Sequence, residues 1–396
     1  MPAPQTPQHS SPPARVRSVL LLCWRDIGHP QGGGSETYLQ RIGAQLAASG
    51  VRVTLRTARY PGAARREVLD GVQIYRAGGR YSVYVWAGLS MAAAAIGLGP
   101  LRKVRPDVVV DTQNGLPFLA RLVYRSRVVV LVHHCHRQQW PVAGRLMGRI
   151  GWFVESQLSP RIHRRNQYVT VSLPSARDLE LLGVDPANVA IVRNGVDAAP
   201  EGTLTVPRSV TPRVVVLSRL VPHKQIEDAL EAIARLRAQI PDLHLDVLGG
   251  GWWSQRLVDH ADRLGISTAV TFHGHVDDET KHSVLQRSWV QLLPSRKEGW
   301  GLAVVEAAQH GVPTIGYRCS GGLSDSIVDG VTGLLVDGYE GLVDGLDRVL
   351  SDEVLREQLG AKAQVRSGEF SWTQSAEAMR VVLESVPDGR RLSGVI

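Results

Sequence analysis

The sequence predicts an α/β protein made of two parallel, doubly wound domains. Its 396 residues exceed what one ordinary hydrophobic core encloses and suit two domains of about 150 to 200 residues. Short runs rich in β-branched residues alternate with helical stretches along the whole chain, which is typical of parallel sheets covered by helices. Prolines without any hydrophobic period mark residues 201–212 as a linker between the two halves.

The same patterns set the outer boundaries. Residues 1–15 are rich in Pro, Gln and Ser and predict a disordered tail. The apolar run that follows spans only six residues, which is short for a signal peptide. We therefore expect a first domain over residues 16–200, a second over residues 213–370, and a closing helix followed by a tail over residues 371–396.

Charge is shared unevenly between the halves. Residues 1–205 carry 25 Lys and Arg against 12 Asp and Glu, a net +13, whereas residues 206–396 carry 20 against 25, a net −5. A basic half attracts polyanions such as nucleic acid, an anionic lipid surface or a phosphorylated acceptor, although an arginine-rich proteome explains the same excess. Three scattered cysteines indicate neither a disulfide framework nor a zinc site, so we expect a reducing, cytoplasmic compartment. No apolar run reaches membrane-spanning length.

In the first domain, a strand over residues 16–23 leads through the loop Gln31-Gly-Gly-Gly-Ser-Glu36 into a helix that ends at Gly50. Three glycines let the backbone approach a ligand closely, and the helix N-terminus offers free N–H groups, so phosphate is the expected ligand. The next predicted elements are strands 51–55 and 72–75, a packed helix over 81–101, strand 108–111, helix 115–124 and strand 127–132.

The last of these strands ends at His133-His-Cys-His136. Ligands of doubly wound sheets bind beyond the carboxyl ends of the strands. Adjacent residues of an extended chain point opposite ways, so His133 and His134 do not both face one small ligand, and their spacing does not suit a metal. From the residues alone, a structural role for each histidine and a ligand contact by one of them both stay open.

Residues 140–165 interleave Trp, Phe, Ile and Met with five arginines, which predicts one or two basic amphipathic helices. Such helices suit an anionic membrane surface. The alternative is that the apolar side chains pack into the core while the arginines are solvated.

The second domain opens with a strand over residues 214–217 that leads into Ser218-Arg-Leu-Val-Pro-His-Lys224. Arg219 and Lys224 bring two cations to the carboxyl edge of the sheet. A departing nucleoside diphosphate needs such fixed positive groups, because its developing charge must be stabilised.

A second strand–loop–helix unit follows near the centre of this domain. The apolar strand 290–293 is ended by Pro294, the loop is opened by Gly299 and Gly301, and a helix beginning near Leu302 is stopped by Gly311. Glu298 stands before the helix and Glu306 on it. Two glutamates at this spacing are more often a solvated face or a cap, but the strand end and the glycines favour an anion site, with phosphate as the expected anion.

These two glutamates, within Glu-Gly-Trp-Gly-Leu-x-x-x-Glu-Ala, resemble the E-x7-E signature of family 4 retaining glycosyltransferases. That family has the GT-B fold, two Rossmann-like domains that face each other across a cleft, and the resemblance covers nearly all of residues 16–386. It assigns Glu298 to the donor sugar and Glu306 to the ribose hydroxyls. It assigns the loop that meets the diphosphate to Trp300, Gly301 and Leu302.

Matches in the first half extend the resemblance. The G-G-x-E loop implies that Gly33 and Gly34 line the cleft beside the diphosphate. A Val-His pair at a strand end resembles the family's donor-sugar histidine, which selects His133, with His134 as the alternative.

Matches in the second half are similar in kind. Arg219 and Lys224 resemble the diphosphate-binding pair of the family's G-R-L…K segment, and the glycine turn and F-x-G segment further on point to Gly250 and His275 as nucleotide contacts. Asp325 stands where the family usually has a Glu, which is a departure from the pattern. The segment 370–372 opens a helix that in GT-B proteins returns to the first domain.

The resemblance implies a retaining transfer of a hexose from a UDP- or GDP-sugar to a hydroxyl acceptor, without cofactor and without a protein nucleophile. No D-x-D or His/Asp ligand set appears, so no divalent metal is expected. From the positive charge of the first half we further expect a membrane-borne lipid or glycan acceptor and a place of action at the inner face of the plasma membrane. Two alternatives stay open: a basic polyanion-binding protein, against which the lack of base-stacking motifs speaks, and a sugar-nucleotide epimerase of the same shape.

Overall fold

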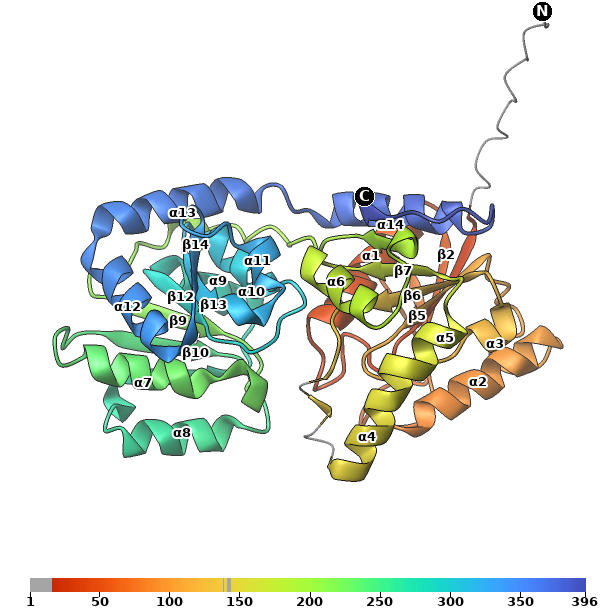
Figure 1. The fold of residues 1–396 in the computed structure, drawn as a ribbon, viewed down its shortest axis with the longest axis horizontal. Helices are drawn as coiled ribbons and strands as arrows, with labels where there is room; N and C mark the ends of the chain where they lie inside the picture. The colour runs from red at the N-terminus through yellow and green to blue at the C-terminus, as the bar shows by residue number, and fades with distance from the viewer. Residues whose placement is uncertain (1–15, 138, 141–143) are drawn as a thin grey trace, which may run out of the picture.

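The computed structural model describes residues 16–137, 139–140 and 144–396; the predicted N-terminal tail lies outside this part of the chain. The described residues form two α/β domains, each built on one largely parallel sheet with helices on both faces (Figure 1). The predicted fold class is therefore confirmed.

The first sheet has nine strands in the order β15-β8-β7-β6-β5-β1-β2-β4-β3. All neighbours are parallel except β3, which pairs antiparallel with β4 at one edge. The strands are β1 (Ser18–Leu22), β2 (Arg52–Thr57), β3 (Arg66–Leu69), β4 (Val72–Arg76), β5 (Val108–Thr112), β6 (Val128–Val132), β7 (Gln167–Thr170), β8 (Val189–Ile191) and β15 (Gly394–Val395).

The second sheet has six parallel strands in the order β11-β10-β9-β12-β13-β14. They are β9 (Arg213–Leu217), β10 (His244–Leu248), β11 (Val270–Gly274), β12 (Val290–Leu293), β13 (Thr314–Tyr317) and β14 (Gly333–Val336). Between β8 and β9 the linker contains only one short 3-10 turn, Thr203–Thr205.

The helices of the first domain are α1 (Gly34–Ala48), α2 (Ser82–Ala95), α3 (Arg121–Tyr124), α4 (Arg145–Phe153), the π-helical turn η2 (Val154–Leu158), α5 (Ser159–Ile162) and α6 (Leu173–Leu181). Those that follow are α7 (Ile226–Leu236), α8 (Ser254–Arg263), α9 (Asp278–Arg287), α10 (Leu302–Ala308), α11 (Leu323–Ser326), α12 (Gly338–Ser351), α13 (Glu353–Ser367) and α14 (Trp372–Ser385).

Strand β1 shows how the first domain is packed. It is buried along its whole length because helices cover both faces of the sheet. Val19 and Leu21 belong to the core on the side of α1 and α14, and Leu20 and Leu22 belong to the core on the side of α2. The carboxyl end of β1 is thus held rigidly where the glycine loop begins.

Two predicted helices of the first domain are shorter than expected. The helix expected over residues 115–124 is reduced to α3, because the buried carboxylate of Asp111 accepts hydrogen bonds from the backbone N–H groups of Phe118 and Ala120 and holds a turn there. The packed helix expected over residues 81–101 is α2, and only its face with Val83 and Ala87 is buried. The opposite face is exposed.

The end of the chain belongs to the first domain. Helix α14 packs against α1, and in Figure 1 it continues from α13, which lies over the second domain. After α14 the chain does not end as a free tail, since Gly394 and Val395 pair in parallel with β8 as an edge strand. The core under α14 also includes Trp300 and Val305 of the second domain, so the two domains share apolar contacts.

Candidate active site

The loop after β12 meets the end of β6 across the two domains. The hydroxyl of Ser172, the N-cap residue of α6, donates to the carbonyl oxygen of Gly299 at 2.6 Å. The Ser175 hydroxyl donates to the carbonyl oxygen of His133 at 2.9 Å. A Cβ atom at Gly299 would lie 2.7 Å from that same His133 oxygen, so the backbones touch and only glycine fits.

Glu298 is held at this junction by the backbone and by a lysine. Its N–H donates to the Ser320 carbonyl at 2.9 Å, and its carboxylate lies 2.5 Å from Lys224 Nζ. Each of these two side chains is only 12% exposed. Burial alone would raise the pKa of Glu298, but the charge and hydrogen bond of Lys224 outweigh it and bring the pKa below its ordinary value. Glu298 is therefore an ionised carboxylate.

Lys224 and Arg219 follow β9, on the loop and 3-10 turn that end at Lys224. Arg219 reaches across to the first domain: a Cβ atom at Gly33 would lie 3.4 Å from Arg219 Nε. Burial and the nearby Arg25 lower the pKa of the Arg219 guanidinium, which stays protonated because the ordinary pKa of a guanidinium lies far above physiological pH.

The glycine loop of the first domain is fixed from within. Gly33 caps α1, and its N–H donates to Glu36 Oε2 at 2.8 Å, while Glu36 Oε1 accepts a hydrogen bond from Arg25 Nε at 3.1 Å. The Glu36 carboxylate is fully buried. The loop that faces Arg219 is consequently rigid, with Gly34 as the first helical residue and open space beside it.

The two histidines at the end of β6 face different surroundings, as the extended chain predicts. His133 is 7% exposed, stacks edge-to-face on Tyr38 at 5.1 Å, and its Nε2 has no hydrogen-bond partner among the described residues. Burial lowers the pKa of His133 to about 3, so it is neutral at physiological pH. The His134 ring lies 3.6 Å from where a Cβ of Gly299 would be, and burial and nearby cationic groups lower its pKa.

Comparison with known protein families identifies the family of this chain. The family described as Glycosyltransferase Family 4 matches residues 32–200, and the family described as Glycosyl transferases group 1 matches residues 207–366. The chain belongs to the family 4 glycosyltransferases of GT-B fold.

Individual relatives agree. Glycogen synthase of Mycobacterium tuberculosis is 28% identical over 94% of this chain and 96% of its own length. A GDP-mannose-dependent α-(1-6)-phosphatidylinositol monomannoside mannosyltransferase of Mycolicibacterium smegmatis is 32% identical over 59% of this chain and 62% of its own length. The structure of sucrose-phosphate synthase from Thermosynechococcus elongatus aligns with a TM-score of 0.75 at 21% identity, over 92% of this chain and 97% of that one.

Glu306 of this glycosyltransferase lies on α10, whereas Glu298 lies in the loop before that helix. The Glu306 carboxylate pairs with Lys281 of α9 at 2.7 Å. Trp300 is 1% exposed and its ring packs edge-to-face against Phe370, so the side chain belongs to the core and its predicted diphosphate contact stays a prediction. Gly301 has φ +93°, which glycine adopts readily, and turns the chain into α10 at Leu302.

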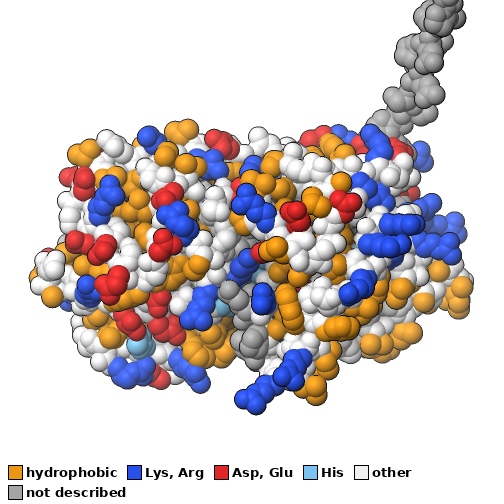
Figure 2. Space-filling view, viewed as in Figure 1, with side chains coloured by type: hydrophobic (Ala, Val, Ile, Leu, Met, Phe, Trp, Pro, Cys, Tyr) orange, Lys and Arg blue, Asp and Glu red, His pale blue; other side chains and the backbone are white. Residues whose placement is uncertain are grey.

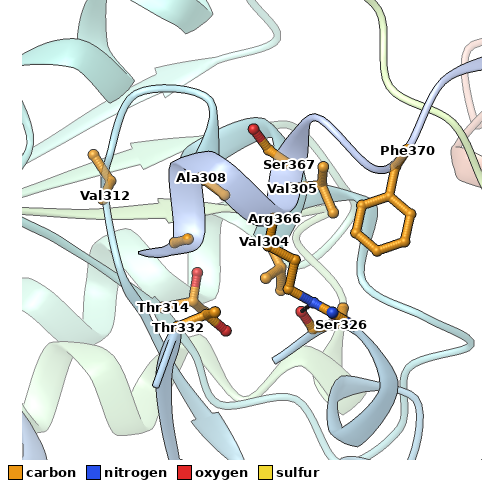
Figure 3. A pocket seen from close by; sticks show the side chains of 11 residues that line it. Val304, Val305, Ala308, Val312, Thr314, Ser326, Thr332, Arg366, Ser367 and Phe370 are labelled. Atoms are coloured by element: carbon orange, nitrogen blue, oxygen red, sulfur yellow. Dashed lines mark hydrogen bonds between the residues drawn. The ribbon is translucent and has the colours of Figure 1, made fainter. Parts of the chain in front are cut away.

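The buried face of α10 packs mainly inside the second domain through Val304, while Val305 belongs to the core under α14. Figure 3 shows Val304 and Val305 of α10 facing a small pocket with Thr314, Arg366 and Phe370 around it, and the Arg366 side chain reaches toward Ser326. This pocket is separate from the Lys224–Glu298 pair. Its lining fixes the helix so that the N-terminal end of α10 carries the loop toward the first domain.

Two predicted nucleotide contacts, Gly250 and His275, form no hydrogen bond with Glu298, Lys224 or Arg219 among the described residues. The carbonyl of Gly250 accepts a hydrogen bond from the Leu220 N–H at 2.9 Å, which fixes the turn after β10. His275 is exposed, while the neighbouring His273 pairs with Asp246 at 2.8 Å. Both positions follow strands, β10 and β11, and so lie at the carboxyl edge of the second sheet. No observation tests their contact with a nucleotide, and their roles stay predictions.

Sequence reasoning missed the contacts that join the domains. Arg193 of the first domain forms a two-bond ion pair with Asp325 of α11, at 2.9 and 3.1 Å, and Lys297 pairs with Asp178 of α6 at 2.5 Å. Asp325, which departs from the family pattern, thus has a partner in the first domain. Only Ser172 carried a usable signal, as a helix N-cap, and that signal does not reveal the contact with the other domain.

Within the described residues, no group of three or more His, Cys, Asp or Glu side chains is arranged to hold a metal ion. Nor does that part of the chain contain a helix of the length and apolarity needed to cross a bilayer.

Proposed function

We propose that this glycosyltransferase transfers a hexose from a nucleoside-diphosphate sugar, UDP- or GDP-linked, to a hydroxyl acceptor with retention of configuration and without a metal ion. The observation that carries the proposal is the pair Lys224 and Glu298 at the edge of the second sheet, with Arg219 reaching toward Gly33 of the first domain. One cation held at the loop after β12 and a second beside the glycine loop suit a diphosphate.

The reaction assigns a role to each group. The bond between the sugar C1 and the diphosphate oxygen breaks, the acceptor oxygen bonds to C1 on the same face, and the acceptor proton passes to the departing phosphate oxygen. Lys224 and Arg219 stabilise the charge that develops on the diphosphate, a role that this chain fills without a metal. Glu298 and His133 orient the sugar, and Glu306 holds the ribose hydroxyls, with Gly33, Gly34, Trp300, Gly301 and Leu302 contributing backbone around the diphosphate.

The state of Glu298 supports retention through the departing phosphate rather than through a covalent intermediate. Its carboxylate is committed to Lys224 at 2.5 Å and sits on a loop clamped by Ser172, so it is poorly placed to move onto C1 as a nucleophile. The lowered pKa of Glu298 keeps it ionised, which suits acceptance of hydrogen bonds from sugar hydroxyls.

The acceptor is a hydroxyl of a cell-envelope glycolipid or polysaccharide, and the enzyme works in the cytoplasm at the inner face of the plasma membrane. The relatives support both acceptor classes: one is named for glycogen and another for phosphatidylinositol monomannoside. The basic first half, with its net +13, supports an anionic surface as the place of action.

A donor panel tests the proposal. Purified protein is incubated with UDP-, GDP- and ADP-linked glucose, galactose and mannose, and release of the nucleoside diphosphate is followed with and without glycan acceptors. We expect one nucleotide to be preferred and turnover to rise with acceptor. Epimerised donor without acceptor would show the alternative of an epimerase, and thermal stabilisation by oligonucleotides but not by UDP or GDP would show a polyanion-binding protein.

A further inference from the structure

Helix α4 rests on the first domain through its smallest residues. Gly148 and Gly151 are its buried positions. A Cβ atom at Gly151 would lie 2.1 Å from the ring of Trp140, and one at Gly115 would lie 3.0 Å from the same ring. The indole is therefore enclosed between two glycines, and the glycine face of α4 is the face turned inward.

This orientation turns the large apolar side chains of α4 outward. Leu146 is 71% exposed, Met147 44%, Ile150 48% and Phe153 58%. Residues 146, 150 and 153 follow the spacing of one helical face, so they form a stripe. A surface helix of a globular protein usually buries such a stripe. The alternative that Trp152, Phe153 and Ile150 pack into the core is wrong for Ile150 and Phe153, which are exposed, whereas Trp152 is half-buried.

Helix α2 adds a second exposed apolar face. Val85 is 63% exposed, Trp86 52% and Leu89 59%. In Figure 1 both α2 and α4 lie along the lower edge of the first domain, and Figure 2 shows hydrophobic side chains along that edge with Lys and Arg among them. Exposed apolar faces of this kind mark interaction sites.

The exposed charge around this surface is positive, since the half-buried Asp107, the one acidic residue between Gly71 and Val110, is engaged by the backbone N–H groups of Arg17 and Ser18. Arg145 and Arg149 of α4 are exposed, as are Arg102, Lys103 and Arg105 after α2. No Asp or Glu occurs between Asp111 and Glu155, and both of these are buried. A partner must therefore be apolar and anionic together, which describes the interface of an anionic bilayer.

We propose that α4 and α2 dock the first domain onto an anionic lipid bilayer, with the apolar stripe in the interface and the arginines at the headgroups. Glu155 lies in the π-helical turn η2, which directly follows α4, and it links this surface to the site. It accepts hydrogen bonds from His136 N at 3.0 Å and from Trp140 Nε1 at 2.6 Å. Docking thus holds the histidine segment of the cleft near the bilayer, where, resting on the proposed function, a lipid-borne acceptor is presented.

Flotation with lipid vesicles tests the docking independently of any sugar chemistry. The full chain is mixed at low salt with vesicles of phosphatidylcholine alone or with about one third phosphatidylglycerol, and the bound fraction is measured after centrifugation. We expect binding to the anionic vesicles only, and release by high salt, because screening weakens charge attraction to the headgroups.

Substitutions then locate the surface. Ile150→Ser/Phe153→Ser should lower the partition coefficient about tenfold, the effect of losing two half-buried apolar contacts. Leu181→Ser/Val365→Ser is the matched control, since those side chains are 85% and 78% exposed on α6 and α13. The control should bind as the wild type does. Circular dichroism and UDP or GDP binding confirm that each variant is folded.

The basic residues are tested in the same way. Arg145→Gln/Arg149→Gln should lower anionic-vesicle binding about fivefold for each charge removed, whereas Lys362→Gln on the exposed face of α13 should not. No flotation at low salt, or flotation unchanged by the α4 variants, would overturn the proposal. A concentration-dependent dimer that the α4 variants dissociate would overturn it too and would assign the surface to a second copy. Donor turnover in solution is scored separately, so loss of the proposed activity is not confused with loss of docking.

Discussion

Removing the charge of Lys224 is the perturbation that most directly separates its roles in chemistry and in stability. Lys224→Met keeps the length of the side chain but leaves the Glu298 carboxylate, 12% exposed, without the partner that lies 2.5 Å away. Breaking such a largely buried pair costs about 3 kcal/mol of unfolding free energy. Losing one fixed group that stabilises the departing diphosphate costs about 10² to 10³ in kcat.

A matched pair elsewhere in the same domain provides the control. Lys281 and Glu306 are 2.7 Å apart, with side chains 17% and 15% exposed, so Lys281→Met should cost a similar amount of stability. Lys281 contacts Glu306, the residue predicted to hold the ribose hydroxyls, and has no predicted contact with the diphosphate. The Lys281→Met variant should therefore mainly raise KM for the donor. Steady-state kinetics at saturating donor, well below the Tm of both variants, give the comparison. A kcat of Lys224→Met within about threefold of wild type, or an equal kcat loss in Lys281→Met, would refute the assignment.

The pH dependence of stability follows from the same contact. In the wild type the folded pKa of Glu298 lies below its unfolded value, so the ion pair contributes stability above about pH 4.5 that is lost as the pH falls through the folded pKa. In Lys224→Met, burial without the lysine raises the folded pKa instead. The variant should therefore be relatively more stable in acid, with a deficit that grows as the pH rises toward neutrality. Urea unfolding from about pH 2.5 to 8 measures both trends, and parallel curves would contradict the role of the pair.

Three further predictions test other parts of the site. Gly299→Ala should lower kcat at least about tenfold with little loss of Tm, because its Cβ would meet the His133 carbonyl at 2.7 Å and hold the domains apart; an unchanged kcat would show that this contact is dispensable. Glu306→Gln should raise KM for the donor with kcat nearly unchanged, since ribose contacts do not change in the transition state, and a pure kcat loss would contradict that role. EDTA should leave activity intact, and activity that disappears with chelator and returns with Mn²⁺ or Mg²⁺ would overturn the metal-free mechanism.

Local features of the site could be read from the sequence because local rules decide them. The strand before Pro294, the start of α10 at Leu302 and the positive φ of Gly311, +63°, all follow from proline and glycine chemistry. The exposure of α4 was open, because periodicity finds the stripe but not the face that packs. Gly151 against Trp140 decides that, and only the folded chain shows it.

Contacts between domains could not be predicted in this way. Ser172 with Gly299 and Arg193 with Asp325 join residues more than 120 positions apart, and single polar residues at such separation leave no periodic signal. The extent of α3 was mispredicted for a similar reason, because the buried carboxylate of Asp111 competes with helix formation through backbone hydrogen bonds that propensity does not anticipate.

In the proposed reaction, Lys224 and Arg219 assist departure of a diphosphate while the acceptor attacks C1 on the same face. NMR of the reaction, recorded in EDTA during the first turnovers with the donor found in the panel, reads the anomeric configuration of the new linkage from its one-bond C1–H1 coupling constant, which differs between α and β anomers for all three sugars. We expect an α-linked product from an α-linked donor, formed at the same rate with and without EDTA. A β-linked first product would contradict retention of configuration, because it would require attack from the opposite face of C1.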